Sequence, residues 1–574
     1  MAIDVKSLTP AGQGNYQKVM QGTPVFEHLE KLTQDPMKYN TELLLQIVQD
    51  NKDTEFGRKH GFADIHTVED FQRLVPISKY DDYADEIWRM TEEGESNLIC
   101  SYPIHHYNKS SGTMGNPKRL PMSEKAIEIS NRYLLGYLNG LLGQKLGMDW
   151  IDGKSISLTE SAASVNTLKC GATYGAVSVK MTLQYRPYLQ MMFTSPDEAT
   201  FPQPDTNTRY LHARFGLMEK NATNTGASFF SFYLELLRYI EHNWEMLVHD
   251  IETGTIDPSV KMSAQVRESL EKKLTPMPER AAQLREIFSQ GFDEPFVPKV
   301  WPKMRYIMGV GTGGFKVYAD KIRERYTGSS VKQLKMGLTA SEGLFSIPFD
   351  LDCDDGVLVP DSVFYEFLPL DAGDDFSKIV TLDQVEEGKE YEIIITNCSG
   401  FYRYRMRDAI LVTGKHNNTP TIQFLYRIDQ NVSIMGEKTT EVALRAAAEN
   451  TAKELEFELI DFSMYPDLEA SPVRYLYFME IGKKPADLKP KEIRYVLEKN
   501  LAIANPSMGD KVKKGICGPT KLNFLEPETY MLYRDLMLAK GVASGQLKPV
   551  RVITNETQRK FFFGLTEYGV ELVK

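Results

Sequence analysis

Hydrophobic residues recur with the period of an amphipathic helix in the first part of this chain and again near its middle. In roughly the first 100 residues, Leu44, Ile47 and Val48 follow this period, and the region reads as helix-rich. The longest pattern predicts a helix over 228–251. Its apolar stripe comprises Phe229, Phe230, Tyr233, Leu236, Leu237, Ile240, Trp244 and Leu247. Charged residues stand between these positions, so we expect the stripe to pack into a core.

Short apolar runs alternate with helices through the middle of the chain. They predict strands over 304–308, 332–338 and 391–396. Strands that alternate with helices indicate an α/β fold with a substantially parallel sheet. In such sheets, ligands bind beyond the carboxyl ends of the strands. Candidate chemistry is therefore expected in the loops that follow these strands.

The pattern changes after residue 425, where a polar stretch precedes an Ala-rich helix that Thr439 or Thr440 would cap. We expect a strand over 474–481, a helix over 491–504 and a last strand near 549–553 to follow. The sequence therefore predicts a large N-terminal domain over 1–428 and a smaller C-terminal α+β domain over 429–574.

Composition and charge exclude several classes of protein. Apolar residues make up 42% of the 574 residues and charged residues 25%, which is typical of folded globular domains. The formal net charge of −11 argues against a nucleic-acid partner, because nucleic-acid binders need a surplus of cations. A small anionic ligand stays possible, since one pocket can be positive on an acidic protein.

Targeting and cysteine patterns indicate a cytoplasmic protein. No window approaches about 18 uninterrupted apolar residues, so we expect no membrane-spanning helix. The N-terminus lacks the apolar region of a secretory signal. The five cysteines are scattered and form no CxxC pair, so neither a disulfide framework nor a zinc cluster is indicated. We predict no obligate protein partner.

The strongest chemical signal is KSSGTMGNPK, over 109–118. Its two glycines permit a tight turn in which several backbone N–H groups converge on one point. The hydroxyl groups of Ser110, Ser111 and Thr113 add donors, and Lys118 adds a positive charge, as a polyphosphate site requires. The spacing differs from the common P-loop, in which lysine directly follows the second glycine. A plain Ser/Gly hairpin is the alternative.

A second candidate is GLTASEG, over 337–343, directly after a predicted strand. Thr339 and Ser341 could contact a nucleotide, and Glu342 could hold Mg²⁺ through a carboxylate oxygen. The alternative is a helix cap with Glu342 in the first helical turn. A third candidate is FYRYRMRD, over 401–408, whose Asp408 could accept both hydroxyls of a ribose. An edge strand with alternating arginines is the alternative there.

Two further patterns are set aside. GVGTGG over 309–314 satisfies GxGxxG but lacks the later acidic residue of a dinucleotide site, so we expect a tight turn. The acidic run over 350–356 lacks the glycine and glutamate that a calcium loop requires at fixed positions, so we expect an acidic hairpin turn.

The three candidate elements, followed by a smaller C-terminal domain, resemble the acyl-adenylate-forming superfamily. More closely, they resemble the auxin-responsive Gretchen Hagen family of acyl acid amido synthetases. The SSGT-rich loop of this family, its Ser-Glu turn and its YRxxD-type element match 110–113, 341–342 and 404–408 in order. Flanking segments such as TEFG (54–57) and GEKTTE (436–441) also fit, so the resemblance spans essentially the whole chain.

The resemblance implies roles for the nucleotide-binding residues. Ser110, Ser111, Thr113 and Lys118 would contact the phosphates of ATP. Thr339 and Ser341 would contact the nucleotide, Glu342 would hold Mg²⁺ and contribute to catalysis, and Asp408 would bind the ribose. Arg427 would contribute to the ATP site beside the domain hinge at Asp429.

The resemblance also implies the remaining site residues and the architecture. Lys548 would be the catalytic lysine, carried by a mobile C-terminal lid domain, and the large domain would include a barrel-like part. Thr159 and Ser161 would lie near the amino-acid acceptor. The acyl pocket would be lined by Tyr133, Tyr137, Leu344 and Phe345, for which ordinary core packing is the alternative.

The sequence departs from the family pattern at two places. Arg407 stands where members usually have glycine, so the backbone or the charge near the ribose is expected to differ. The second element begins Leu338-Thr339-Ala340 and lacks the tyrosine that could stack on adenine.

The activity implied by the resemblance is an ATP-dependent ligase. A small carboxylic acid would attack ATP to give an acyl-adenylate and pyrophosphate, and an amino acid would then displace AMP. ATP and Mg²⁺ would be the cofactors. Two alternatives stay open: an acyl-CoA synthetase, which shares the first half-reaction, and a non-catalytic nucleotide-binding protein.

Overall fold

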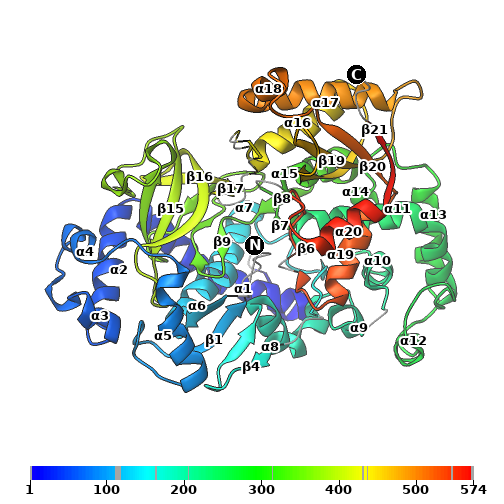
Figure 1. Cartoon of the computed structure of the whole chain (residues 1–574). Helices are drawn as coiled ribbons and strands as arrows, with labels where there is room; N and C mark the ends of the chain where they lie inside the picture. Colours follow the sequence, from blue (N-terminus) through cyan, green and yellow to red (C-terminus); the bar gives the residue numbers. More distant parts are fainter. Residues whose placement is uncertain are drawn as a thin grey trace. The chain divides into compact units, whose positions relative to one another are not determined.

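The computed structural model (Figure 1) describes residues 3–109, 118–161, 165–203, 206–312, 315–428, 432, 434–435, 437, 439–544 and 547–570. The chain divides into two units. The first unit comprises Met1–Met406, Ile410–Phe424 and Gly541–Gln546. The second unit comprises Arg407–Ala409, Leu425–Lys540 and Leu547–Lys574.

Helices dominate the start of the first unit, as the apolar periodicity predicts. They include α1 (Pro10–Leu32), α2 (Pro36–Asn51), α6 (Glu124–Asn131), η5 (Arg132–Tyr137) and α7 (Leu138–Leu146). Glycines let α1 and α7 approach closely, because a Cβ atom at Gly140 would lie only 2.3 Å from the carbonyl oxygen of Gly22. Leu44, Ile47 and Val48 of α2 are buried in the core of this unit.

A four-stranded parallel sheet lies in the first unit. Its strands, in spatial order, are β3 (Ser155–Ser157), β6 (Asn224–Phe229), β7 (Tyr306–Val310) and β8 (Lys332–Lys335). The long helix predicted over 228–251 is α11 (Phe230–Thr253), which follows β6 directly. It begins two residues later than predicted because Phe229 pairs with Val310 in the sheet.

A seven-stranded sheet packs its apolar residues into the same core as the first helices. In order, its strands are β11 (Ser346–Ile347), β12 (Gly356–Leu358), β17 (Thr419–Arg427), β16 (Tyr404–His416), β15 (Glu390–Thr396), β13 (Phe364–Pro369) and β14 (Val380–Thr381). Within the described part of the chain, no pairing joins β11 to β14 to close a barrel. β16 lies in the interior of the sheet, so the edge-strand alternative for 401–408 is wrong.

A smaller sheet carries the start of the predicted phosphate loop. Its strands, in order, are β2 (Arg119–Ser123), β1 (Ile104–Lys109), β5 (Thr173–Gly175) and β4 (Asn166–Thr167). β1 pairs antiparallel with β2 and parallel with β5. It is therefore held by backbone hydrogen bonds on both sides.

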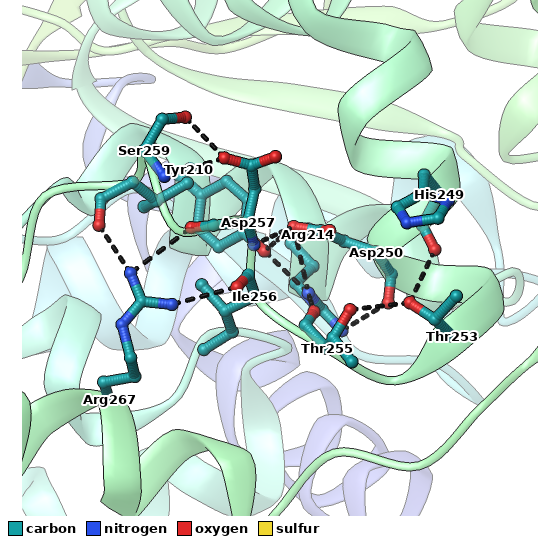
Figure 2. A network of polar contacts seen from close by, with 11 residues as sticks. Tyr210, Arg214, His249, Asp250, Thr253, Thr255, Ile256, Asp257, Ser259 and Arg267 are labelled. Atoms are coloured by element: carbon teal, nitrogen blue, oxygen red, sulfur yellow. Dashed lines mark hydrogen bonds and ion pairs between the residues drawn. The ribbon is translucent and has the colours of Figure 1, made fainter.

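Polar side chains tie α10 (Thr208–Met218) to the end of α11, as Figure 2 shows. A carboxylate oxygen of Asp250 accepts hydrogen bonds from the Tyr210 hydroxyl at 2.6 Å and from the backbone N–H of Asp257 at 2.8 Å. Arg214 donates to the Asp250 carbonyl at 2.8 Å. Arg214 and Asp250 are 0% and 1% exposed, so their charges compensate each other in the interior.

The second unit places helices on both faces of one sheet. The strands, in order, are β18 (Leu459–Asp467), β19 (Arg474–Ile481), β20 (Lys521–Leu525) and β21 (Thr566–Val570). Tyr475 and Tyr477 of β19 pack with α16 (Glu441–Glu454) and α17 (Pro490–Ala504). Phe478, which points to the other face, packs with α19 (Thr529–Ala539) and α20 (Glu556–Gly564).

The prediction of a last strand near 549–553 is wrong. Val552 forms only an isolated bridge to Met464, and the last strand is β21. Pro549 cannot donate a backbone hydrogen bond, and Asn555 caps α20 only a few residues later, so the extended segment is short. Among the helices of the described residues, none has the length and apolarity that crossing a bilayer would demand.

Candidate functional site

The Ser341–Glu342 segment is the tip of a tight β-hairpin. β9 (Thr339–Ala340) and β10 (Gly343–Leu344) pair antiparallel, with Ala340 opposite Gly343. Ser341 and Glu342 are thus the two residues of the turn. The alternative that this segment caps a helix is therefore wrong. Thr339 is exposed, while Ser341 and Glu342 are half-buried.

Two buried asparagines hold this turn. Asn108 of β1 donates from Nδ2 to the Ser341 carbonyl at 2.9 Å, and Asn397, which follows β15, donates from Nδ2 to the Glu342 carbonyl at 2.8 Å. Asn108 lies two residues before the segment 110–117. That segment, with the predicted phosphate-binding residues Ser110, Ser111 and Thr113, lies outside the described residues. The structure nevertheless brings β1, the strand that leads into this segment, to the Ser-Glu turn.

Lys118 follows that segment and directly precedes β2. Its Nζ atom lies 4.9 Å from the centre of the Tyr80 ring, which is within cation–π distance. Lys109 and Arg119 are paired across β1 and β2, so the strands that flank the predicted loop are fixed at both of its ends.

Two of the three arginines of the third motif form ion pairs with buried glutamates. Arg403 and Arg405 form ion pairs with Glu366 and Glu392, at 2.9 and 2.7 Å. Both glutamates are almost fully buried, at 1% and 2% exposure, so these pairs stabilise the sheet. Their burial explains the alternation of arginine with aromatic residues in the sequence.

Asp408 is buried and partnered. The Nε–H group of Arg427 donates to its carboxylate at 3.1 Å. Arg407, at the position where the resemblance led us to expect glycine, has a φ of 58°. This is the left-handed region that glycine adopts without steric cost. A backbone conformation that suits glycine is therefore present here, although the residue is arginine.

Thr159 and Ser161 lie just beyond the carboxyl end of β3, where ligands of parallel sheets bind. The Thr159 hydroxyl lies 2.9 Å from the Ser157 hydroxyl, and the Ser161 N–H donates to the Thr200 carbonyl at 2.7 Å. Both residues are half-buried.

Sequence reasoning missed the buried polar group around Glu160. The Thr208 hydroxyl donates to the Glu160 carboxylate at 2.9 Å, and His212 Nε2 lies 3.9 Å from the same oxygen. His212 Nδ1 lies 2.7 Å from the Ser195 hydroxyl. The Ser544 hydroxyl donates to the Glu160 carbonyl at 3.0 Å. These residues are far apart in the sequence, so no local pattern could have joined them.

The four residues predicted to line the acyl pocket are buried in the core of the first unit. They are Tyr133, Tyr137, Leu344 and Phe345. The Tyr133 hydroxyl donates to the Asp361 carboxylate, and burial raises the pKa of Tyr133 well above its ordinary value. The Tyr137 ring stacks on that of Phe26, with 5.7 Å between centroids. Both a closed pocket wall and ordinary core packing require such burial, so the acyl-pocket role of these residues stays a prediction.

Lys548 is an exposed residue of the second unit and lies beside an anchored segment. The backbone of Met464 bonds to Arg551 and Ile553 at 2.9 and 2.8 Å. The Arg551 guanidinium is 2.5 Å from the Asp461 carboxylate. These contacts fix the chain just after Lys548 to β18. The predicted hinge residue Asp429 lies outside the described residues.

The acidic run over 350–356 is neutralised by protein cations. Asp350 and Asp352 lie 2.9 and 3.0 Å from Lys145 and Lys332, and Asp354 pairs with Lys335. This supports an acidic turn over a calcium loop. Taking the described residues together, no three His, Cys, Asp or Glu side chains are grouped to hold a metal ion.

Comparison with protein families covers most of the chain. The GH3 family N-terminal domain matches residues 25–332, the GH3 central domain 356–427 and the GH3 C-terminal domain 442–557. The chain is 28% identical to the probable indole-3-acetic acid-amido synthetase GH3.11 of Oryza sativa subsp. japonica, over 94% of this chain and 95% of that protein. It is 27% identical to the jasmonoyl–L-amino acid synthetase JAR6 of Nicotiana attenuata, over 94% of each chain.

Solved structures show the same architecture. The GH3.15 acyl acid amido synthetase superposes with a TM-score of 0.82 and 25% identity, over 95% of this chain and 96% of that one. A structure titled AtGH3.15 acyl acid amido synthetase in complex with 2,4-DB gives a TM-score of 0.81, over 99% and 98%. A 2-hydroxyisobutyryl-CoA ligase, at 14% identity and a TM-score of 0.50 over 90% and 89% of the two chains, shares the fold alone.

Proposed function

The chain belongs to the GH3 family, and from this premise we propose that it is an ATP-dependent ligase that joins a carboxylic acid to an amino acid through an acyl-adenylate. The observation that carries the proposal is the match of three successive GH3 domains along the chain. Relatives named as amido synthetases, which match over nearly their full length, support the same reaction.

The reaction takes place in two steps. A carboxylate oxygen of the acid attacks the α-phosphorus of ATP, and the bond to pyrophosphate breaks. The nitrogen of the amino acid then attacks the acyl carbon, the bond to AMP breaks, and the nitrogen loses a proton. In the first step an anion attacks a polyanion, so the protein must supply positive charge and hydrogen-bond donors. Ser110, Ser111, Thr113 and Lys118 are our candidates for the phosphates.

Glu342 is our candidate for holding Mg²⁺. In nucleotide sites, Mg²⁺ usually takes one or two protein carboxylates together with phosphate oxygens. Glu342 supplies one such carboxylate, and Asn108 holds its turn beside the start of the predicted phosphate loop. This donor set fits Mg²⁺. When bound, the ion would neutralise charge on the phosphate oxygens. Thr339 and Ser341 of the same hairpin are our candidates for contacts with the nucleotide.

Asp408 and Arg427 are our candidates for the ribose end of the site. The ribose hydroxyls would donate to the Asp408 carboxylate, which Arg427 holds through one oxygen. Lys548 would neutralise charge that develops on the α-phosphate. We further propose that 429–574 is a mobile lid that turns at Asp429 between the two steps, and that Thr159 and Ser161 contact the amino-acid acceptor.

Pyrophosphate exchange tests the first step. The protein is incubated with ATP, labelled pyrophosphate and a panel of aryl, indolyl and aliphatic acids, followed by an amino-acid mixture or CoA. We expect exchange with at least one acid and an amide product identified by mass. A thioester formed with CoA in place of an amide would support the acyl-CoA synthetase alternative. No exchange with any acid would favour a non-catalytic nucleotide-binding protein.

A further inference from the structure

Two asparagines, one in β1 and one directly after β15, bond to the same two-residue turn. We propose that Asn108 and Asn397 are positioning residues that hold the backbone on both sides of Glu342 and thereby direct its carboxylate toward Mg²⁺ and ATP. This inference rests on the proposed function and adds two residues to it. Both side chains are buried, at 3% and 2% exposure, in the first unit.

The two hydrogen bonds restrain both backbone torsions of Glu342. The Ser341 carbonyl belongs to the peptide unit that enters Glu342, and the Glu342 carbonyl belongs to the unit that leaves it. Each peptide unit is planar, so holding one carbonyl orients the whole unit. Asn108 holds the first unit and Asn397 holds the second. The direction of the Cα–Cβ bond of Glu342 is then set by its backbone.

The two donors are themselves rigid. The Oδ1 atom of Asn397 accepts hydrogen bonds from the backbone N–H groups of Ser399 and Phe401, at 2.9 and 3.1 Å, so both ends of its amide are engaged. Asn108 lies in a strand that pairs with a neighbour on each side, opposite Leu120 and Gly175. Metal ligands must be held to within about 0.5 Å by such surroundings. A hairpin tip without these bonds would sample more conformations.

Asn108 also links two parts of the proposed site. It lies in β1, two residues before the predicted phosphate loop, and its amide orients the turn that carries the predicted Mg²⁺ ligand. In nucleotide sites, Mg²⁺ is usually bound by a protein carboxylate together with phosphate oxygens. The distance between the turn that carries Glu342 and the predicted phosphate loop must therefore stay constant. Asn108 contacts the turn from the strand that leads into the predicted loop, so this strand would help to maintain the spacing.

The sharpest variants are Asn108→Asp and Asn397→Asp. Each is nearly isosteric and replaces the donating amide with a carboxylate oxygen. In Asn397→Asp, the Oδ1 acceptor of the Ser399 and Phe401 N–H groups is retained. Asn15→Asp is the matched control, because Asn15 is also buried and its Nδ2 donates to the carbonyls of Ile151 and Gly153, at 2.9 and 3.2 Å. Glu342→Gln removes the proposed ligand itself.

The readout is ATP affinity measured by titration calorimetry, with Mg²⁺ and with a chelator. We expect Mg²⁺ to increase the affinity of the wild type and of Asn15→Asp to the same extent. In each variant at the turn, the factor by which Mg²⁺ increases ATP affinity should be about fivefold smaller than in the wild type, which is the equivalent of one hydrogen bond. The affinity for ATP without metal should not change. In Glu342→Gln, the Mg²⁺ factor should fall by at least as much.

Retention of the full Mg²⁺ effect in both turn variants would overturn the inference, as would an equal loss in Asn15→Asp. Failure of the wild type to bind ATP under either condition would instead overturn the proposed function. If an aspartate variant does not fold, Asn108→Ser and Asn397→Ser remove the amide without adding a charge. The same loss is expected from them, and a full Mg²⁺ effect would again contradict the inference.

Discussion

Arg407 has a left-handed backbone conformation, with a φ of 58°. An L side chain there costs about 1–2 kcal/mol, and glycine avoids this cost but loses about 0.5–1 kcal/mol of backbone entropy. We therefore expect Arg407→Gly to increase the free energy of unfolding by about 0.5 kcal/mol. The midpoint of urea unfolding measures the change.

Arg403 provides the contrasting variant. It is also left-handed, with a φ of 46°, but its guanidinium bonds both carboxylate oxygens of the buried Glu366. Arg403→Gly would leave that buried carboxylate without its counter-charge, which costs about 3–5 kcal/mol. If Arg407→Gly proved as damaging as Arg403→Gly, the Arg407 side chain, and not its backbone, would decide stability at this position.

His106 of β1 is a fully buried imidazole whose Nδ1 lies 2.8 Å from the Thr173 hydroxyl. Burial, aided by the charge of Lys180, lowers the pKa of His106 from 6.5 to about 4. The unfolded chain therefore binds a proton at a higher pH than the folded protein does. The stability that neutral His106 contributes is complete above pH 6.5 and is lost as the pH falls toward 4.

His106→Gln should flatten this dependence. Between about pH 7 and 4, we expect the wild type to lose about 2–3 kcal/mol more unfolding free energy than the variant. Urea unfolding across this pH range measures both proteins. Parallel stability curves would show that the pKa of His106 does not differ between the folded and unfolded states, which would contradict the prediction.

At the scale of elements, the sequence predicted helices and strands well where a single hydrophobic pattern corresponded to a single helix or strand. The strand over 474–481 is β19, and the helix over 491–504 is α17, one residue longer. The Thr440 hydroxyl caps α16 by accepting the Ala443 N–H at 3.1 Å, as predicted. The prediction of a strand near 549–553 failed because this segment forms only one isolated bridge to β18, between Val552 and Met464, and no ladder of backbone pairs.

The Arg214–Asp250 pair joins α10 to α11 and is buried (Figure 2). Asp250→Leu would leave the Arg214 guanidinium buried without its counter-charge, so we expect a loss of about 3–5 kcal/mol in unfolding free energy. Arg214→Met combined with Asp250→Leu removes both charges and should cost less than the sum of the single variants, by about 1–3 kcal/mol. Urea unfolding of the three variants tests this, and strictly additive losses would contradict a direct pairing.

At the scale of the whole molecule, the sequence predicted motifs but not the contacts between them. Ser341, Glu342 and Asp408 could be predicted as site residues because each lies in a short stretch of unusual composition. The hydrogen bond from Asn108 to Ser341 joins residues that are 233 positions apart. The sequence around Asn108 and Asn397 does not distinguish them from asparagines in ordinary turns. Likewise, only the fold brings Ser195 and His212 together beside Glu160. Such contacts depend on tertiary packing, which a single sequence does not display.

The two proposed half-reactions should depend differently on the second unit, which carries Lys548. A preorganised charge at the developing phosphate anion typically contributes about 10²–10³ in rate. We expect Lys548→Ala to slow pyrophosphate exchange by about that factor. In the role that we propose, its charge serves the phosphate only in the first step, so the variant should still convert a supplied acyl-adenylate and amino acid to the amide at nearly the wild-type rate. The matched control is Lys540→Ala, because Lys540 is an exposed lysine that follows α19 in the same unit. This variant should leave both steps unchanged.

Exchange in Lys548→Ala within about threefold of the wild type would refute the role of this lysine, since a lost preorganised charge costs far more. An equal loss in both half-reactions would instead place Lys548 in a step that they share.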